Sequence, residues 1–153
     1  MSRLENLISN LESKIAHCDI SNLEVSKSTV GWQIDHSLRV VNAIILQLKN
    51  SNQNDYKWQF NFKRLLVFSL NKIPRGKGTA PKSVQCYEKI IEQNLVILIE
   101  ISKKLISELD SLPIKSNFKH PYFGVLNLKQ SIKFLNIHTN HHLKIVNDIL
   151  KKK

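Results

Sequence analysis

Apolar residues recur at helical spacing near the start of the chain. The first such stretch begins at Ser2, whose hydroxyl can cap a helix while Glu5 completes a capping box. The second runs from about Gly31 to Lys49, after a polar linker. It carries two apolar stripes on different faces, which predicts a helix buried on two sides. The stripes are Leu4, Ile8, Leu11 and Ile15 in the first helix, and Ile34, Leu38, Val41, Ile45 and Leu48, with Trp32, His36, Val40 and Ala43 on another face, in the second.

Three further helices are expected later in the chain. They cover roughly residues 56–71, 83–110 and 128–150, and the last has Asn127 as its expected cap, with Gln130 three residues on. The loop KIPRGKGTAPKS separates the first two of these helices, because its prolines and glycines interrupt helical structure. The apolar stripes of these two helices are Phe60, Leu65, Leu66, Phe68 and Leu70, and Tyr87, Ile91, Asn94, Leu98, Ile101 and Leu105.

The pattern as a whole predicts an all-α protein. No run of strand length alternates between apolar and polar residues, and no internal repeat is present. We therefore expect a bundle of four long helices with an additional short helix. A length of 153 residues fits one domain, spanning residues 1–153, that can bury a substantial core.

The charge of the chain is strongly basic. The formal net charge is +11, and residues 57–82 hold seven Lys or Arg and no acid. Basic proteins often bind nucleic acid or acidic surfaces. Nearly all of the positive residues are lysines, however, and the chain is also rich in Asn and Ile, a combination that AT-rich coding produces without selection for a polyanion. We therefore expect no nucleic-acid binding, while the basic segment 57–82 stays open as a contact for an acidic partner.

Neither export nor membrane insertion is expected from the sequence. Glu5 stands where a signal peptide would be apolar, and the longest strongly apolar run, residues 94–101, is far too short to cross a bilayer. Two cysteines, Cys18 and Cys86, make no disulfide framework. The expected location is a reducing compartment, the cytoplasm.

Three histidines crowd into the stretch NIHTNHHLKI of the last predicted helix. His138 and His142 fall on its inward stripe, and residues four apart lie on the same side of a helix, so both rings can reach one ion. His141 lies about 60° around the helix from His138, which makes it a neighbour and not a third ligand. The stripe consists of Leu135, His138, His142, Ile145 and Ile149.

A third ligand has to come from another helix, and His36 is the candidate. It sits between Trp32 and Val40 on the second apolar face of its helix. Buried imidazoles need hydrogen-bond partners, and a divalent transition metal answers the same need. Three protein ligands also leave an open coordination position. The alternative is that each histidine is a satisfied core residue, which is the commoner role of a single histidine on an apolar face.

Three motifs in this order resemble the DinB-like superfamily of metal-binding four-helix bundles. They are WQIDHSLR at residues 32–39, HPYFGVLN at residues 120–127 and IHTNHHLK at residues 137–144. The resemblance spans roughly residues 25–150, and the HPYFG lead-in and the loop KIPRGKGTAPK resemble one family of the superfamily that has no assigned function. It implies a bundle of the up-down-down-up type, with the metal held by His36, His138 and His142. His141 matches a position that is not a ligand.

The resemblance also implies a class of function. Relatives use a divalent metal, with zinc or nickel expected first and iron third, and some use a low-molecular-weight thiol. We expect a metal-dependent enzyme that acts on a small molecule, with thiol-dependent transfer or isomerisation favoured over hydrolysis. The alternative is a non-catalytic bundle whose metal site is structural or vestigial and whose basic surface contacts an acidic partner. A homodimer is expected only because dimers are the commonest oligomers among soluble proteins.

Residues beside the three histidines have two interpretations each. His120 is a candidate acid, base or supporting group of the site, or it fixes the loop ahead of the last helix by a hydrogen bond. Trp32, Tyr122 and His141 are candidates for lining a pocket, although Trp32 and Tyr122 also suit core packing. Asp35 is expected to form a surface salt bridge. The sequence contains no HExxH, GxSxG, P-loop or CxxC motif, so it names no reaction.

Overall fold

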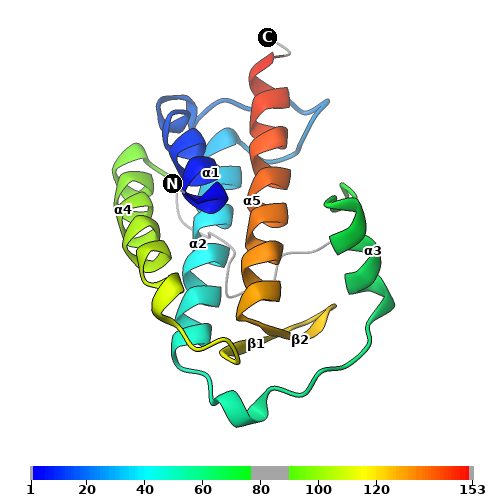
Figure 1. The fold of residues 1–153 in the computed structure, drawn as a ribbon. Coiled ribbons are helices and arrows are strands. Elements are labelled where there is room, and N and C mark those ends of the chain that lie inside the picture. The colour runs from blue at the N-terminus through cyan, green and yellow to red at the C-terminus, as the bar shows by residue number, and fades with distance from the viewer. Residues whose placement is uncertain (1, 77–89, 152–153) are drawn as a thin grey trace.

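The computed structural model describes residues 2–76 and 90–151, and its helices and strands are drawn in Figure 1. In the described part of the chain, most residues are helical and two short strands form a small sheet. The α-helices are α1 (Arg3–Glu12), α2 (Val30–Lys49), α3 (Phe62–Leu70), α4 (Glu92–Ser107) and α5 (Leu128–Lys151), and the strands are β1 (Asn117–His120) and β2 (Gly124–Asn127). The mostly helical architecture agrees with the sequence prediction.

Four of the helices pack side by side around a common core. Helix α2 contacts α4 and α5, and α1 contacts the same two helices. In Figure 1, α2 and α4 run from top to bottom, whereas α1 and α5 run from bottom to top. Helix α3 stands apart from these four helices. Its main helix contact in the described chain is with α5. The core is therefore built by α1, α2, α4 and α5.

The expected helix starts are present as hydrogen bonds. The Ser2 hydroxyl and the Glu5 carboxylate form the predicted capping box of α1. The Thr29 hydroxyl accepts from the backbone N–H of Trp32 at the start of α2. At the start of α5, the side-chain oxygen of Asn127 accepts from the backbone N–H of Gln130 at 3.0 Å, and the bond in the other direction measures 3.1 Å. These caps fix where α2 and α5, the two helices that carry the histidines, begin.

Helix α2 is buried on two sides, as its two stripes predict. The main stripe is fully buried against α4 and α5, and it consists of Ile34, Leu38, Val41, Ile45 and Leu48. On the second face His36 and Val40 are buried, while Trp32 and Ala43 are half-buried. A histidine on this helix therefore lies inside the protein and not on its surface.

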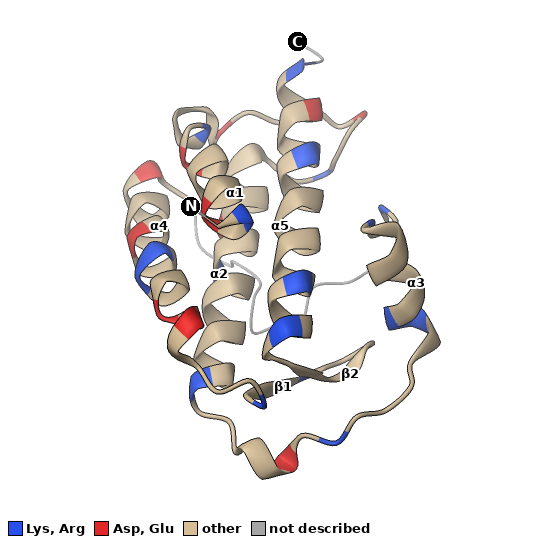
Figure 2. Cartoon of the chain, viewed as in Figure 1, with Lys and Arg blue, Asp and Glu red and all other residues tan. Residues whose placement is uncertain are grey.

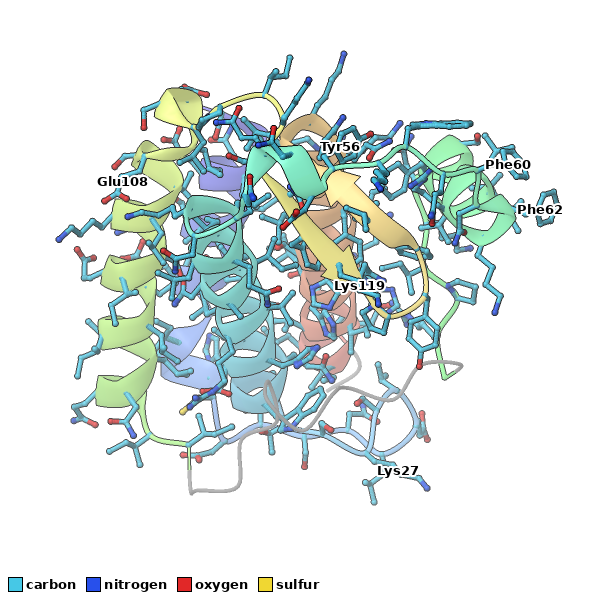
Figure 3. The ribbon with its side chains drawn as sticks, turned by 90° about the horizontal axis from the view of Figure 1, so that it is seen from below. Lys27, Tyr56, Phe60, Phe62, Glu108 and Lys119 are labelled. Carbon is cyan, nitrogen blue, oxygen red and sulfur yellow. The ribbon has the colours of Figure 1, made fainter. Side chains whose placement is uncertain are left out.

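The expectation for the third helix was wrong in its length and in the direction of its apolar face. Helix α3 covers only Phe62–Leu70. Its apolar side chains are half or more exposed, with the exceptions of Val67 and Phe68, which are partly buried and pack on the core. Figure 3 shows Phe60 and Phe62 pointing away from the body of the protein. The buried residue is instead Arg64, whose guanidinium donates to the backbone carbonyls of Phe123 and Val125 at 3.3 and 3.4 Å. Helix α3 is thus attached to the strands by a charged side chain.

The predicted stripe of the fourth helix was correct only in part. Its expected start at residue 83 and its Tyr87 lie outside the described residues, and α4 begins at Glu92. Leu105 is buried and Leu98 packs on the core as predicted, whereas Ile101 is exposed. The buried stripe runs through Leu95, Ile99, Ser102, Leu105 and Ile106. Apolar residues occur on nearly every side of this helix, so periodicity alone does not select the face that packs.

A β-hairpin replaces the irregular loop that the sequence suggested before the last helix. Strands β1 and β2 pair antiparallel, with Phe118 opposite Leu126 and His120 opposite Gly124. Gly124 has a φ of +71°, a conformation that favours glycine, and it starts the second strand. The hairpin packs across the ends of α2 and α5. The expectation that no strand forms was wrong, because each strand has only four residues, too few for an alternating pattern to be read.

Figure 2 shows where Lys, Arg, Asp and Glu fall along the described elements. Among these described residues, Arg64 and Asp35 are buried. Asp35 is only 2% exposed and pairs with Arg39 at 2.7 Å, so the expectation of a surface salt bridge was correct about the pairing and wrong about the location. Arg75 pairs with Asp148 and ties the segment after α3 to α5. No helix in the described ranges is both long enough and apolar enough to span a membrane.

The start of α2 touches the preceding turn so closely that only glycine fits at position 31. A Cβ on Gly31 would lie 2.9 Å from the Cys18 carbonyl oxygen and 3.1 Å from a side-chain carbon of Ile90. We predict that Gly31→Ala destabilises the protein by about 1–3 kcal/mol, because the added methyl group has no free space. Urea unfolding followed by circular dichroism measures this, with Ser9→Ala on the exposed face of α1 as control. Equal unfolding midpoints for both variants would contradict the close contact.

Candidate metal centre

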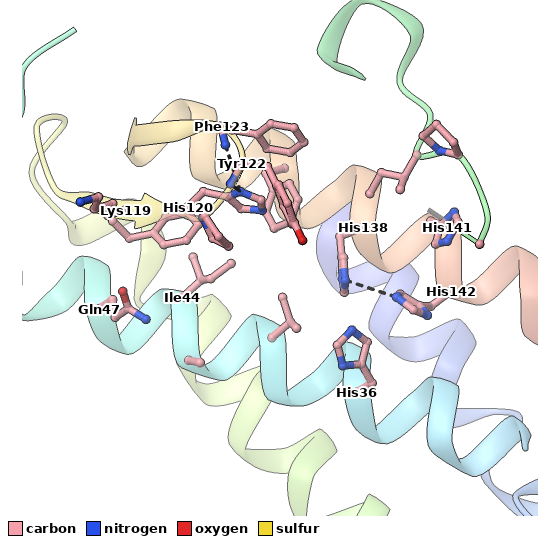
Figure 4. Close-up of a pocket in the computed structure, with 18 of the residues that line it drawn as sticks. His36, Ile44, Gln47, Lys119, His120, Tyr122, Phe123, His138, His141 and His142 are labelled. Carbon is pink, nitrogen blue, oxygen red and sulfur yellow. Dashed lines mark hydrogen bonds between the residues drawn. The ribbon is translucent and has the colours of Figure 1, made fainter. Parts of the chain in front are cut away.

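Three histidines from two helices meet in the core. His36 comes from α2, and His138 and His142 come from consecutive turns of α5. One nitrogen of each ring lies within 4.8 Å of a nitrogen of each other ring. The ring centroids are 4.5 to 5.2 Å apart, and no two of the three rings are parallel. The structure thus brings together the three residues that the sequence selected (Figure 4).

The spacing of the nitrogen atoms suits a bound ion. Nε2 of His138 and Nε2 of His142 are 3.2 Å apart. Two nitrogens that each bind a metal at roughly 2.0–2.1 Å in tetrahedral geometry lie about 3.3–3.4 Å from one another. The His138–His142 pair is therefore already at the separation that a shared ion requires, and the same two atoms form a hydrogen bond when no ion lies between them.

Residues around the cluster hold two of its rings in place. Nδ1 of His142 lies 2.6 Å from the side-chain oxygen of Gln33, whose amide nitrogen donates to the hydroxyl of Ser26 at 3.1 Å. In this arrangement Nδ1 of His142 carries the proton, and its Nε2 is left with a lone pair directed at the cluster. Trp32 stacks on His36, with ring centroids 5.0 Å apart and planes inclined by 10°.

Two rings of the cluster, His138 and His142, are held in their neutral form. Burial lowers the pKa of both His138 and His142 well below its usual value, and the neighbouring imidazoles lower it further. Nδ1 of His138 is buried with no hydrogen-bond partner. Neutral imidazoles that cannot take up protons are the form in which histidine binds metals. A donor set of three imidazole nitrogens fits a divalent transition metal.

A pocket of about 500 Å³ opens beside the three histidines. Helix α2, the hairpin, α5 and the segment before residue 77 form its walls, and most of the surface that they present is apolar. His36, His138 and His142 lie at one end, and Gln47 and Lys119 lie at the other end (Figure 4). No Asp or Glu of the described residues lines it. An ion held by the histidines would therefore face an accessible cavity.

Each pocket candidate from the sequence lines this cavity. Trp32, Tyr122, His120 and His141 all contribute to its wall. His141 does not belong to the cluster of three; its ring hydrogen bonds to the backbone of Ile73, and burial lowers its pKa. Its position agrees with the prediction that it neighbours the site without being a ligand.

His120 fixes the turn of the hairpin. Its Nδ1 accepts from the backbone N–H of Tyr122 at 3.1 Å and from that of Phe123 at 3.2 Å. Its ring stacks on Phe123 and meets the edge of Phe134. The loop-fixing hydrogen bond is thus present, and because Nδ1 is occupied by donors, the proton of the neutral ring resides on Nε2.

Gln33 is the residue of the site that the sequence interpretation missed. It lies three residues before His36, one helical turn away, and only 3% of its surface is exposed. A polar residue on the buried face of a helix, one turn from a candidate ligand, is the signal that would have found it.

No family model, curated protein or solved structure matches this chain. The functional assignment rests on the histidine cluster and on the pocket beside it.

The buried state of His120 predicts a pH dependence of stability. Burial lowers its pKa to about 4 from a usual 6.5, so the unfolded chain binds more protons than the folded chain between these values. The stabilisation is complete above about pH 6.5 and is lost as the pH falls toward 4. We predict that the urea midpoint of metal-free protein drops over this range, and that the drop is smaller in His120→Asn, whose amide oxygen still accepts from the turn. An equal drop in both proteins would contradict the burial of a neutral His120.

Proposed function

We propose that the protein is a DinB-like metalloprotein in which His36, His138 and His142 bind one divalent transition metal, zinc or nickel in the first place. The observation that carries the proposal is the convergence of three buried imidazoles from α2 and α5 beside an accessible pocket. The opposite directions of α2 and α5 and the pairwise contacts among α1, α2, α4 and α5 suit a bundle of that superfamily.

We further propose that the metal serves an enzyme that acts on a small molecule. Three uncharged ligands leave the full charge of the ion and at least one open position, so a bound metal would polarise a substrate or lower the pKa of a coordinated thiol or water. The cavity of about 500 Å³ is of the size that small-molecule sites have.

Thiol-dependent transfer or isomerisation is favoured over hydrolysis within this proposal. A metal hydrolase usually needs a base near the bound water, and the described lining of the pocket contains no carboxylate. Nδ1 of His120 is occupied by two backbone donors, so its ring offers no free lone pair in the neutral state. A thiol coordinated to a dication loses its proton to solvent without such a base.

The residues of this chain would orient the ligands. Gln33 holds the His142 ring with Nε2 toward the ion, and Trp32 supports the His36 ring from the other side. The competing proposal is a non-catalytic bundle with a structural or vestigial site, in which exposed Lys57 and Lys63 beside exposed Phe60 and Phe62 contact an acidic partner. Stoichiometric binding together with ligand exchange at the ion separates the two.

The first test is metal binding by the untagged protein. We expect one zinc or nickel ion per chain by elemental analysis, and a rise in melting temperature of about 5–10 °C at a metal concentration one hundred-fold above Kd. His138→Ala should lose the ion and the rise. His141→Ala is the matched control, since it removes a neighbouring imidazole that is outside the cluster. If wild-type protein binds no stoichiometric metal, or if His141→Ala loses it equally, the site is not the one proposed.

The second test concerns the hydrogen bond of His142. Removing the hydrogen-bond partner of a metal-bound histidine typically lowers the metal affinity by about 10–100-fold. We expect this loss in Gln33→Leu, which cannot accept from Nδ1, and a much smaller loss in Gln33→Glu, which keeps an acceptor at the same position. Competition with a chromophoric chelator measures both affinities. Wild-type affinity in Gln33→Leu would show that Gln33 does not hold the ring.

A further inference from the structure

The ring of His120 presents a fixed hydrogen-bond donor to the pocket. Its Nδ1 accepts two backbone N–H groups of the hairpin turn, so the neutral ring carries its proton on Nε2. The two nitrogens of an imidazole point in widely different directions, and Nε2 is therefore directed away from the turn. Because His120 lines the pocket, that direction leads into the cavity.

A second donor lies beside it. The Tyr122 ring neighbours that of His120, with centroids 6.0 Å apart, and its hydroxyl points toward the space between His120 and His138 (Figure 4). Both residues belong to the HPYFG turn, so one local structure positions both groups. They face the three histidines across the cavity.

The wall between these groups is suited to an apolar body. Ile44, Phe118 and Phe134 also line the cavity, and no carboxylate of the described chain is among the lining residues. A cavity with donors, apolar walls and no acid favours a ligand that supplies oxygen acceptors of its own.

We propose that Nε2–H of His120 and the hydroxyl of Tyr122 form a subsite for a carboxylate or carbonyl oxygen of the substrate, whose other end reaches the metal. The proposal rests on the proposed function, since it places the ligand between the ion and the hairpin. It assigns the substrate to small carboxylate or carbonyl compounds with an apolar body. His120 acts as a neutral donor that sets specificity, and its ring stays uncharged because burial lowers its pKa to about 4.

The experiment uses cobalt-loaded protein and two thiols of equal length, mercaptohexanoate and hexanethiol. Both coordinate through sulfur, and the thiolate-to-cobalt absorption band reports binding of each. We expect the wild type to bind mercaptohexanoate about ten-fold more tightly, as a charge-assisted hydrogen bond provides. His120→Asn keeps an acceptor for the turn and lacks the distal donor, so it should lose this preference while its affinity for hexanethiol is unchanged. Tyr122→Phe should lose part of the preference.

Lys119→Met is the matched control, because Lys119 lines the same pocket and forms no ion pair with the described residues. The preference for mercaptohexanoate should persist in it. A preference that survives His120→Asn, or that disappears in Lys119→Met alone, overturns the subsite. Failure of the proposed function has a different signature, since a protein without the metal site shows no cobalt–thiolate band with either thiol, and the subsite falls with it.

Discussion

Three imidazole rings share one layer of an otherwise apolar core, and the rest of the site follows from the cost of placing them there. Burial and mutual proximity lower the pKa of His138 and His142, and no acid is among the groups that act on them. These two rings therefore stay neutral, and their nitrogens need hydrogen-bond partners. Gln33 satisfies one nitrogen of His142, whereas Nδ1 of His138 has no partner. Buried imidazole nitrogens without partners destabilise a protein core, whereas the same nitrogens are suitable ligands for a metal ion.

The hairpin determines what the cluster can reach. Hairpin residues supply one wall of the mostly apolar cavity that the cluster faces. Arg64 binds the carbonyls of this hairpin from α3, and His120 caps its turn from within. A charged group and an imidazole thus replace apolar packing in building the wall opposite the ion. The hydrogen bonds of Arg64 and His120 to the backbone hold the hairpin in shape. A substrate in the pocket would meet only the hydrogen-bond donors that these bonds leave unused.

The helices that carry the histidines could be read from the sequence, and the parts that complete the site could not. In α2 and α5 the apolar stripes are regular, with two stripes on α2 and one on α5, so His36, His138 and His142 were placed inward correctly. In α4 apolar residues cover nearly all sides, and of the predicted stripe Ile101 proved exposed while Leu105 is buried. The hairpin was not predicted because its strands have only four residues each, too few to show an alternation of apolar and polar residues. Gln33 escaped because a single buried amide is defined by its partner on another helix, 109 residues away.

The location of the three rings also constrains how descendants of this chain can change. The helix stripes on which the rings lie otherwise carry buried aliphatic residues, namely Val40 beside His36, and Leu135, Ile145 and Ile149 beside His138 and His142. Replacing buried polar groups by well-packed aliphatic ones is commonly neutral or stabilising when no function is lost. A lineage that no longer required the cluster would therefore drift toward an ordinary hydrophobic core within a few substitutions. Retention of all three rings in a descendant would be a record of continuing selection for what they bind.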